Sequence, residues 1–358
     1  MDMKALVLSG GKGTRLRPFT HSLAKQLVPV ANKPVLVHCL ETIRDIGVRE
    51  VGIIVGDNAD EIEKVIGGNS AIAADMHITY IKQDQPLGLA HCVLIAEEFL
   101  ADDDFVMYLG DNVLGDGIGE AARRFRQTRP DAHLLAAKVS DPRQYGVVEV
   151  DHDGIVRALV EKPEKPRSDL AVMGVYFFTP AIHRAVRSIR PSGRGELEIT
   201  DAIQHLVSSG AKVTAEAYPG YWKDTGSIDD LIECNRVLLD RCAGDVRGQV
   251  DERSELRGPV IVEEGATVSG SDLVGPLVIG AGSVVTDSRV GPYTAVERDC
   301  VITGSAVENS ILLEGARVLG VAGVRDSVVG RWAHVRSAGG QERNRVLIGD
   351  HASVEVAA

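Results

Sequence analysis

The sequence lacks the usual marks of zinc-binding, disulfide-stabilised and membrane proteins. Its five cysteines are odd in number and scattered, at positions 39, 92, 234, 242 and 300. Zinc and redox sites need close cysteine pairs, so we interpret these residues as buried thiols in a reducing compartment. No apolar run reaches spanning length, and the N-terminal apolar stretch is too short for a signal peptide. These absences predict a soluble, cytoplasmic protein.

The sequence also lacks an excess of positive charge. Thirty-nine basic and 51 acidic residues give a net charge of −12. This balance argues against a nucleic-acid groove or an anionic membrane surface as partner, so phosphate chemistry must use local cations. The length of 358 residues predicts two domains, each able to bury its own core.

The first part of the chain alternates short apolar runs with amphipathic stretches. The apolar runs, which we interpret as buried strands, are residues 5–8, 51–55, 78–81 and 105–109. The expected helices span residues 34–46, 88–100, 180–188, 198–208 and 228–241, and a last strand spans 212–217. Pro34 suits the first turn of its helix, and Gly47 suits its end. This βαβ alternation predicts a doubly wound, mostly parallel sheet.

The last third of the chain is built from short repeated units. Each unit has an aliphatic residue, then an acidic residue or glycine, then two free positions and a small residue, and it recurs at 262–266, 279–283, 290–294, 329–333 and 348–352. Separations near multiples of six are typical of a hexapeptide β-helix. A β-sandwich with glycine turns is the alternative. The composition changes near residues 244–255, so we predict a catalytic domain at 1–243 and a repeat domain at 244–358.

A glycine-rich loop follows the first predicted strand. Gly10, Gly11 and Gly13 can bring backbone N–H groups close to a phosphate, and Lys12, Arg15 and Arg17 add positive charge. The loop is neither a Walker loop nor a GxGxxG motif. On its own it predicts only phosphate binding at a strand-to-helix turn.

Further charged residues could act on the same phosphates. Lys25 provides a second cation, although a lysine is more often simply solvated. Asp111 follows a predicted strand, where open α/β sheets bind ligands, and Asp224 lies in the segment Trp-Lys-Asp-Thr-Gly. Two carboxylates suit Mg²⁺, a hard cation. Glu161 and Lys162 suit a hydroxyl-rich, phosphorylated sugar, although each could also be ordinary surface charge.

Taken together, these motifs resemble the glucose-1-phosphate thymidylyltransferases, in the long bacterial form with a C-terminal β-helix. The resemblance rests on the order and spacing of the motifs GGKGTRLRPFT (10–20), AKQLVPVANKP (24–34), LGDN (109–112), YGVVE (145–149), EKP (161–163), GVYFF (174–178), GELEITD (195–201) and WKDTG (222–226). It implies a Rossmann-like nucleotidyltransferase domain with a mixed, mostly parallel sheet, followed by a left-handed parallel β-helix. It also implies a homo-oligomer.

The resemblance implies roles for individual residues. The nucleotide would contact Leu8, Gly10, Gly11, Gly13, Thr14, Arg15, Gln83, Gly88 and Asp111. The sugar phosphate would contact Asn112, Tyr145, Gly146, Glu161, Lys162 and Gly174. The catalytic set would be Arg15, Lys25, Asp111, Lys162 and Asp224, with the two aspartates holding Mg²⁺. Gln83 suits thymine or uracil, because one amide can both donate and accept.

The implied reaction is the transfer of a nucleotidyl group from dTTP to α-D-glucose 1-phosphate, which yields dTDP-glucose and pyrophosphate. A sugar phosphate is already anionic, so catalysis would come from positioning two anions and neutralising their charge, without a covalent enzyme intermediate.

Three alternatives stay open at the level of sequence. The first is an enzyme that uses UTP or makes another NDP-sugar, because Ser9 and the segment 86–91 depart from the common pattern. The second is a bifunctional enzyme whose β-helix is an acyltransferase, with His334 and His351 as candidate histidines. The third is a catalytically dead regulatory homologue, which we would expect to have lost cations and aspartates that this chain retains.

Overall fold

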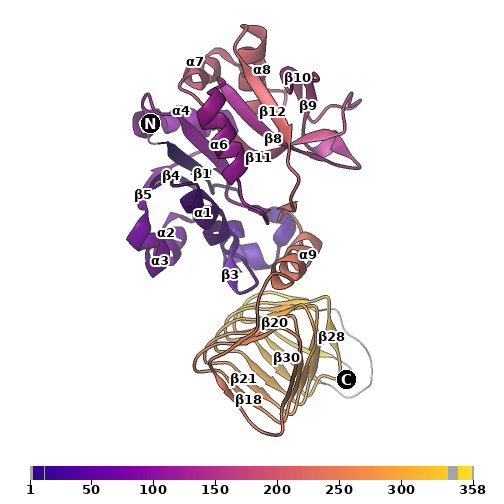
Figure 1. Ribbon diagram of the computed structural model, residues 1–358. Coiled ribbons are helices and arrows are strands. Elements are labelled where there is room, and N and C mark those ends of the chain that lie inside the picture. The colour runs from indigo at the N-terminus through magenta and orange to yellow at the C-terminus, as the bar shows by residue number, and fades with distance from the viewer. Residues whose placement is uncertain (1–2, 12, 338–345, 357–358) are drawn as a thin grey trace. The chain divides into compact units, whose positions relative to one another are not determined.

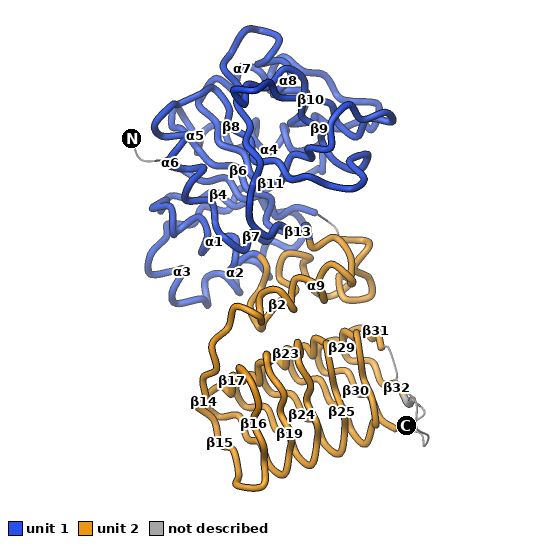
Figure 2. Tube along the Cα trace, turned by 45° about the vertical axis from the view of Figure 1, so that its right-hand side comes forward, with its two compact units in different colours: residues 1–11, 36–224 blue, residues 12–35, 225–358 orange. Residues whose placement is uncertain are grey.

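The structure is a computed structural model that describes residues 3–11, 13–337 and 346–356 (Figure 1). It divides into two compact units, coloured separately in Figure 2. Unit 1 comprises residues 1–11 and 36–224, and unit 2 comprises residues 12–35 and 225–358. The loop after the first strand is therefore divided after Gly11, and the segment that follows is grouped with the C-terminal repeats.

Unit 1 contains a nine-stranded mixed sheet. Its strands are β1 (Lys4–Leu8), β4 (Glu50–Val55), β5 (His77–Lys82), β6 (Phe105–Leu109), β8 (Ala132–Lys138), β9 (Gly146–Val150), β10 (Val156–Glu161), β11 (Leu170–Phe178) and β12 (Val213–Ala217). The main path runs β10-β9-β11-β6-β1-β4-β5, and β8 pairs with both β11 and β12. Strands β5, β4, β1 and β6 are parallel, whereas β11 is antiparallel to β6, β8 and β9. The mixed, mostly parallel sheet is thus confirmed.

Helices cover the sheet of unit 1 on both faces. They are α1 (Val35–Asp45), α2 (Ala59–Gly67), α3 (Ser70–Asp75), α4 (Leu89–Ile95), α5 (Glu97–Leu100), α6 (Gly119–Thr128), α7 (Ala181–Ser188) and α8 (Ile199–Ser208), with the 3-10 turn η4 (Pro142–Gln144). Strand β11 shows why: Phe178 packs against Phe105 on one side, and Phe177 stacks on Phe125 of α6, each pair at 5.5 Å between ring centroids. A strand buried on both faces must be almost continuously apolar, as β11 is.

The helix expected at 88–100 is two helices in the structure. Ala96 has φ −90° and ψ 3°, outside the helical range, so α4 ends at Ile95 and α5 begins at Glu97. Gly47 ends α1 as expected: its φ is 83°, and its N–H donates to the carbonyl of Arg44 at 2.9 Å. Pro34 lies one residue before α1, in a short strand.

The repeats of unit 2 form a parallel β-helix with three faces, as predicted. One sheet contains β14 (Asp245–Val246), β17 (Val260–Val262), β20 (Leu277–Ile279), β23 (Thr294–Val296), β26 (Ile311–Leu312), β29 (Val328–Val329) and β31 (Leu347–Ile348). The second contains β15 (Gln249–Val250), β18 (Thr267–Ser269), β21 (Val284–Thr286), β24 (Val301–Thr303), β27 (Arg317–Leu319), β30 (His334–Ser337) and β32 (Ser353–Val356). The third contains β16 (Glu255–Arg257), β19 (Asp272–Val274), β22 (Arg289–Val290), β25 (Ala306–Glu308) and β28 (Val324–Arg325).

The interior of the β-helix combines aliphatic side chains with a ladder of buried serines. Val262, Ile279 and Val296 follow one another on successive coils and are fully buried. At one corner each serine accepts a hydrogen bond from the next coil: Ser288 Oγ accepts from the N–H of Ser305 at 3.1 Å. The coils therefore satisfy buried backbone groups that the tight corners would otherwise leave unpaired.

The rest of unit 2 is the segment that follows the glycine loop, together with one long helix. The segment contains the 3-10 turns η1 (Thr14–Leu16), η2 (Phe19–His21) and η3 (Lys25–Leu27) and the strands β2 (Pro29–Val30) and β3 (Lys33–Pro34). Helix α9 spans Ile228–Leu239. Ser227, the residue before it, is the N-cap, and its side chain accepts a hydrogen bond from the N–H of Asp230. Asn235 of α9 accepts from the N–H of Ala31 at 2.9 Å and donates to the carbonyl of Tyr293 at 2.9 Å. The helix thus joins the segment to the β-helix.

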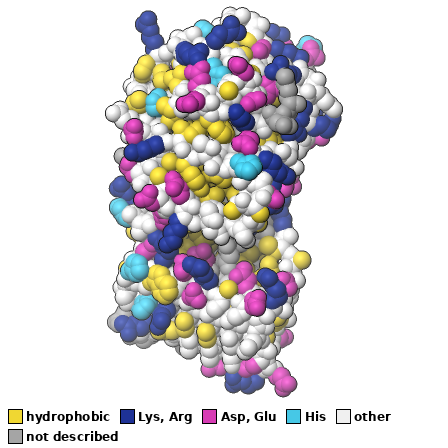
Figure 3. Space-filling model, turned by 90° about the vertical axis from the view of Figure 1, so that its left-hand side faces the viewer, with side chains coloured by type: hydrophobic (Ala, Val, Ile, Leu, Met, Phe, Trp, Pro, Cys, Tyr) yellow, Lys and Arg dark blue, Asp and Glu magenta, His cyan; other side chains and the backbone are white. Residues whose placement is uncertain are grey.

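The surface is mixed in charge. On the face in Figure 3, basic and acidic side chains are interspersed over the described residues. None of the five cysteines forms a disulfide bond. Across the described residues, no helix has the length and apolar character needed to span a bilayer.

Candidate active site

The candidate site lies at the carboxyl ends of the parallel strands of unit 1. Strand β1 pairs with β4 and β6 in register, so Leu8 lies between Ile54 and Leu109. Gly10 and Gly11 follow β1, and Asp111 follows β6. Ligands of open α/β sheets bind at this edge, where strands diverge on either side of a central strand.

A two-stranded ribbon brings Asp224 to the same edge. Strand β13 (Trp222–Asp224) pairs antiparallel with β7 (Asn112–Leu114), so that Asp224 lies opposite Asn112, the residue after Asp111. The buried Asn112 is held on both sides: its Nδ2 donates to Asp111 Oδ1 at 2.8 Å, and its Oδ1 accepts from the indole N–H of Trp222 at 2.6 Å. Of the two predicted metal ligands, Asp111 thus directly precedes β7 and is oriented by Asn112, while Asp224 ends the neighbouring β13. Two carboxylates suit Mg²⁺.

The negative charge of Asp111 acts on a neighbouring thiol. Burial raises the pKa of Cys39 on α1 well above its usual range, and the charge of Asp111 raises it further. The thiol of Cys39 is therefore protonated at neutral pH.

A pocket of about 240 Å³ opens beside this edge. All six residues predicted to contact the sugar phosphate line it together with Asp224: Asn112, Tyr145, Gly146, Glu161, Lys162 and Gly174. Its wall also includes Leu89, Trp222, Tyr176, Arg194, Glu198 and Thr200, whose contribution to a pocket the sequence reasoning missed. The structure thus brings together residues that are far apart in the chain.

Glu161 is the central acidic group of the pocket. Its Oε2 accepts from the hydroxyl of Thr200 at 3.1 Å, and its Oε1 lies 3.4 Å from Arg194 Nη2 and 3.6 Å from Lys162 Nζ. Arg194 also donates to the buried Glu198 at 2.8 Å, and this hydrogen bond raises the pKa of the guanidinium. Glu161 therefore presents a carboxylate beside two cations, and such groups can bind the hydroxyls and the phosphate of a phosphorylated sugar.

Two glycines leave room in the pocket wall. A Cβ at Gly146 would lie 2.8 Å from Thr200 Cγ2, and a Cβ at Gly174 would lie 2.9 Å from the amide of Asn112. Both distances are shorter than any ordinary contact between heavy atoms. These positions therefore require glycine for close packing against the groups that line the pocket.

Two aromatic residues that line the pocket are in contact with each other. Tyr145 and Trp222 meet edge to face, with 5.6 Å between their ring centroids. Lys162 has φ 42°, and its N–H donates to the carbonyl of Tyr145 at 3.0 Å. From the sequence, the WKDTG segment was assigned only the role of supplying Asp224, and the place of Trp222 in the pocket was missed.

Gln83 is held by two neighbours on α4. Its Nε2 lies 3.1 Å from His91 Nδ1 and donates to Cys92 Sγ at 3.3 Å, and its Oε1 would lie 3.2 Å from a Cβ at Gly10. The carbonyl oxygen of the amide is thus turned to the glycine loop. Gly88 has φ 103° and lies against the backbone of Leu197, where a Cβ would be 2.5 Å from its carbonyl oxygen. A side chain at Gly88 is therefore excluded.

The remaining predicted residues belong to unit 2. Gly13 has φ 59° and packs against the stem of Lys25, since a Cβ on Gly13 would lie 2.8 Å from Lys25 Cβ. The carbonyl of Gly13 accepts from the hydroxyl of Thr20 at 2.7 Å. Thr14 and Arg15 form η1, and Lys25 opens η3 with 8% of its surface exposed. Lys12 lies outside the described residues. Gly13 and Lys25 thus pack together within one folded segment.

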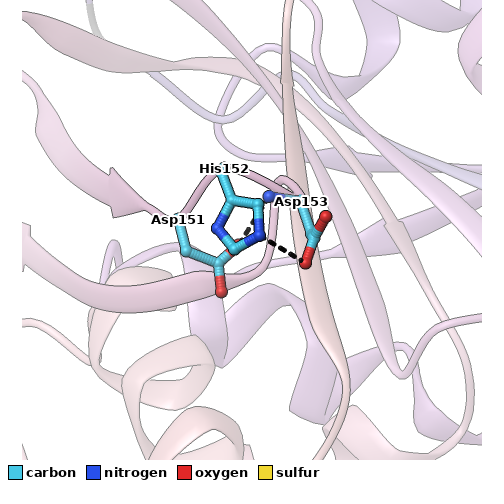
Figure 4. Close-up of side chains that lie close together, drawn as sticks. All are labelled: Asp151, His152 and Asp153. Carbon is cyan, nitrogen blue, oxygen red and sulfur yellow. Dashed lines mark hydrogen bonds and ion pairs between the residues drawn. The ribbon is translucent and has the colours of Figure 1, made fainter.

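One further group of potential metal ligands among the described residues lies in the turn between β9 and β10 (Figure 4). His152 Nε2 lies 3.2 Å from Asp153, and Asp151 Oδ1 accepts from the N–H groups of Ile155 and Asp153 at 2.9 and 3.0 Å. The bond from Ile155 is the main cause of the lowered pKa of Asp151. This carboxylate holds the turn together, and we assign the cluster no ligand.

Comparison with known proteins agrees with this geometry. The sequence profile described as "Nucleotidyl transferase" matches residues 4–241. The chain belongs to this nucleotidyl transferase family. It is 53% identical over 355 residues to the glucose-1-phosphate thymidylyltransferase of Streptomyces griseus and 52% identical over 356 residues to that of Streptomyces antibioticus, covering 99% of each protein and of itself.

A solved structure shares the catalytic fold. A Bacillus anthracis protein crystallised with sucrose aligns with a TM-score of 0.62 and 30% identity, over 68% of this chain and 98% of that one. The family resemblance expected from the ordered motifs is confirmed, and it extends through the β-helix in the two Streptomyces relatives.

Proposed function

We propose that this protein is a glucose-1-phosphate thymidylyltransferase. It joins dTTP to α-D-glucose 1-phosphate and releases dTDP-glucose and pyrophosphate. The observation that carries the proposal is the pocket in which Asn112, Glu161, Lys162 and Gly174 meet beside Asp224. Similarity to the two Streptomyces thymidylyltransferases over 99% of the chain supports it.

We propose that the sugar phosphate is held by the pocket. Glu161 accepts hydrogen bonds from sugar hydroxyls, while Lys162 and Arg194 supply positive charge to the phosphate. A phosphate oxygen of the sugar phosphate then attacks the α-phosphorus of dTTP in line, and the bond to the leaving pyrophosphate breaks on the opposite side. Positioning and charge neutralisation supply the catalysis, because the nucleophile needs no deprotonation.

Asp111 and Asp224 are the residues that would hold Mg²⁺. When bound, this ion would neutralise negative charge on the phosphates. Asn112 keeps the carboxylate of Asp111 oriented through its hydrogen bond of 2.8 Å. Arg15 and Lys25 would neutralise negative charge on the triphosphate.

The base preference follows from the amide of Gln83. Its Nε2 is engaged by His91 and Cys92, so its Oε1 is the atom that would accept a hydrogen bond from an N–H group of the base. Thymine and uracil present an N3–H donor at this edge, whereas cytosine presents an acceptor and is disfavoured. Gln83 alone does not distinguish thymine from uracil, so UTP is the competing substrate to measure.

The experiment is a matrix of dTTP, UTP, ATP, CTP and GTP against the 1-phosphates of glucose, galactose, mannose and N-acetylglucosamine, with pyrophosphate release as readout. We expect the highest kcat/KM for dTTP with glucose 1-phosphate. Asp111→Asn should lower turnover by orders of magnitude in the presence of Mg²⁺. A higher kcat/KM with UTP would replace the proposed nucleotide, and full activity of Asp111→Asn would remove Asp111 from the metal site.

The cytoplasmic location, the homo-oligomer and the boundary between residues 243 and 244 stay predictions. So does the absence of nucleic acid and membrane partners.

A further inference from the structure

The segment that carries Arg15 and Lys25 forms hydrogen bonds with the β-helix at two places. At the first, the hydroxyl of Ser22 donates to Asp350 Oδ2 at 2.7 Å, and Arg331 Nη2 donates to the carbonyl of Ser22 at 2.6 Å. At the second, Asn32 Nδ2 donates to the carbonyl of Val296 at 2.6 Å. Figure 2 shows this segment in the same colour as the β-helix, because both belong to unit 2.

The first of these contacts involves a partly buried ion pair between residues of two successive coils, Arg331 and Asp350. Asp350 has a side chain that is 4% exposed, and it accepts from the backbone N–H of Arg331 at 2.8 Å and from Arg331 Nε at 2.7 Å. With the bond from Ser22 this carboxylate receives three donors. A buried carboxylate with three donors has a defined orientation, so it can fix the position of the backbone that it contacts.

Packing accompanies these hydrogen bonds. A Cβ on Gly349 would lie 3.1 Å from Pro18 Cβ, so the absence of a side chain at Gly349 allows Pro18 to pack closely on the last described coils. Pro18 and Ser22 flank η2, which comes after Arg15 and before Lys25 in the chain. Thr20, within η2, in turn bonds the carbonyl of Gly13. The contacts thus connect the β-helix corner to both cations through one short stretch of backbone.

We propose that Arg331 and Asp350 are positioning residues for nucleotidyl transfer: they hold the backbone of residues 18–22 and thereby set the placement of Arg15 and Lys25. The β-helix then contributes to the reaction without touching substrate. This inference rests on the proposed function, in which those two cations act on the triphosphate. The sugar pocket is built from residues of unit 1, so the effect is confined to the nucleotide.

The test compares three single variants. Arg331→Ala removes the ion pair and the bond to the carbonyl of Ser22. Ser22→Ala removes only the hydroxyl that donates to Asp350. Because Ser22 is exposed, this variant tests the same contact if Arg331→Ala folds poorly. Arg298→Ala is the matched control, because Arg298 forms an ion pair with Glu314 at 2.8 Å at the equivalent corner of another coil.

Two readouts are measured on each full-length protein: steady-state kinetics with dTTP and glucose 1-phosphate, and hydrogen exchange of the peptide covering residues 16–24. We expect Arg331→Ala to raise the KM for dTTP or lower kcat at least tenfold and to speed exchange at least fivefold. Ser22→Ala should act in the same direction by about threefold. The KM for glucose 1-phosphate should stay within twofold in every variant, as should all values for Arg298→Ala.

The double variant Ser22→Ala/Arg331→Ala should exchange no faster than Arg331→Ala alone, because both substitutions act through one contact. Unchanged exchange and unchanged kinetics in Arg331→Ala would overturn the proposal. Faster exchange with kinetics within twofold would overturn the positioning role and leave a structural one. A wild-type protein that forms no dTDP-glucose would instead overturn the proposed function. The exchange data would still show whether Arg331 and Asp350 hold the backbone of residues 18–22.

Discussion

Gly174 provides a direct test of how the floor of the sugar pocket supports the metal site. Replacing it with alanine adds one methyl group, which would lie 2.8 Å from Leu109 Cβ and 2.9 Å from Asn112 Cγ and Nδ2. Ordinary carbon contacts are about 3.5–4.0 Å, so Asn112 or the β11 backbone must move by roughly 0.5–1 Å. The backbone φ of Gly174 is not in the left-handed region, so the effect is steric alone.

Asn112 has little freedom to move away. It is 3% exposed, and both ends of its amide are engaged, by the indole of Trp222 at 2.6 Å and by Asp111 at 2.8 Å. Overpacking of such a site costs about 1–3 kcal/mol, which corresponds to a fall in Tm of roughly 2–4 °C for each kcal/mol. Misplacement of a reacting group by about 1 Å can cost roughly 100-fold in rate, so we expect kcat to fall by about 10- to 100-fold.

The assay is continuous pyrophosphate release with dTTP, glucose 1-phosphate and Mg²⁺, combined with a thermal melt. Gly119→Ala is the control, because nothing lies within 4 Å of the added Cβ and Gly119 begins α6. This control should keep wild-type kcat and gain up to about 1 kcal/mol from higher helix propensity. Wild-type kcat in Gly174→Ala, at any Tm, would refute the idea that Asn112 transmits packing at Gly174 to Asp111.

Three further predictions concern single groups. Glu161→Gln should raise the KM for glucose 1-phosphate about tenfold or more, because hydrogen bonds to a charged acceptor are worth about 1.5–3 kcal/mol; an unchanged KM in steady-state kinetics would exclude Glu161 from sugar binding. Ser288→Ala should destabilise the β-helix by about 1–3 kcal/mol in denaturant melts, because the buried N–H of Ser305 loses its acceptor, while the exposed Thr303→Ala should be neutral. Burial raises the pKa of Glu297 from 4.5 to about 7, so the folded state favours the protonated carboxyl. The stability that this group contributes is fully present below about pH 4.5, and the free energy of unfolding falls as the pH rises from there through 7. Glu297→Gln should therefore raise Tm relative to wild type by more at pH 8 than at pH 5, and an equal change at both values would contradict the shifted pKa.

The sequence predicted the elements whose signals are local. Strand β6 is a run of apolar residues, and Gly47 ends α1 with the positive φ that favours glycine. The β-helix followed from the repeat, because each unit places one aliphatic residue inward and the coils have no other way to bury it. The structure slips from a strict six-residue register, as shown by serine hydrogen bonds that join residues 17 apart, such as Ser288 and Ser305.

Site residues that carry a charge within a recognisable motif were predicted from the sequence, whereas other residues of the site were missed. Glu161 and Lys162 were expected in the pocket and line it. Thr200 lies in the helix expected at 198–208 and Arg194 in the stretch before it, and neither was assigned a role in the site. Trp222 was quoted only as a neighbour of Asp224. Its role in holding Asn112 depends on the pairing of β13 with β7, which joins residues 110 apart in the chain and which periodicity does not reveal.

The grouping of the glycine-loop segment with the β-helix was beyond sequence reasoning for a related reason. The motif order places Arg15 and Lys25 inside the first domain, yet Ser22 contacts Asp350 across 328 residues. A partial signal was present: Arg331 and Asp350 occupy equivalent places in two repeats, Val-Gly-Arg-Trp-Ala and Ile-Gly-Asp-His-Ala, and opposite charges at equivalent places of stacked coils pair with each other. That pattern predicts the ion pair but not the contact with Ser22. Arg331 has further N–H donors besides those that bind Asp350, and only the structure shows that one of them donates to the carbonyl of Ser22.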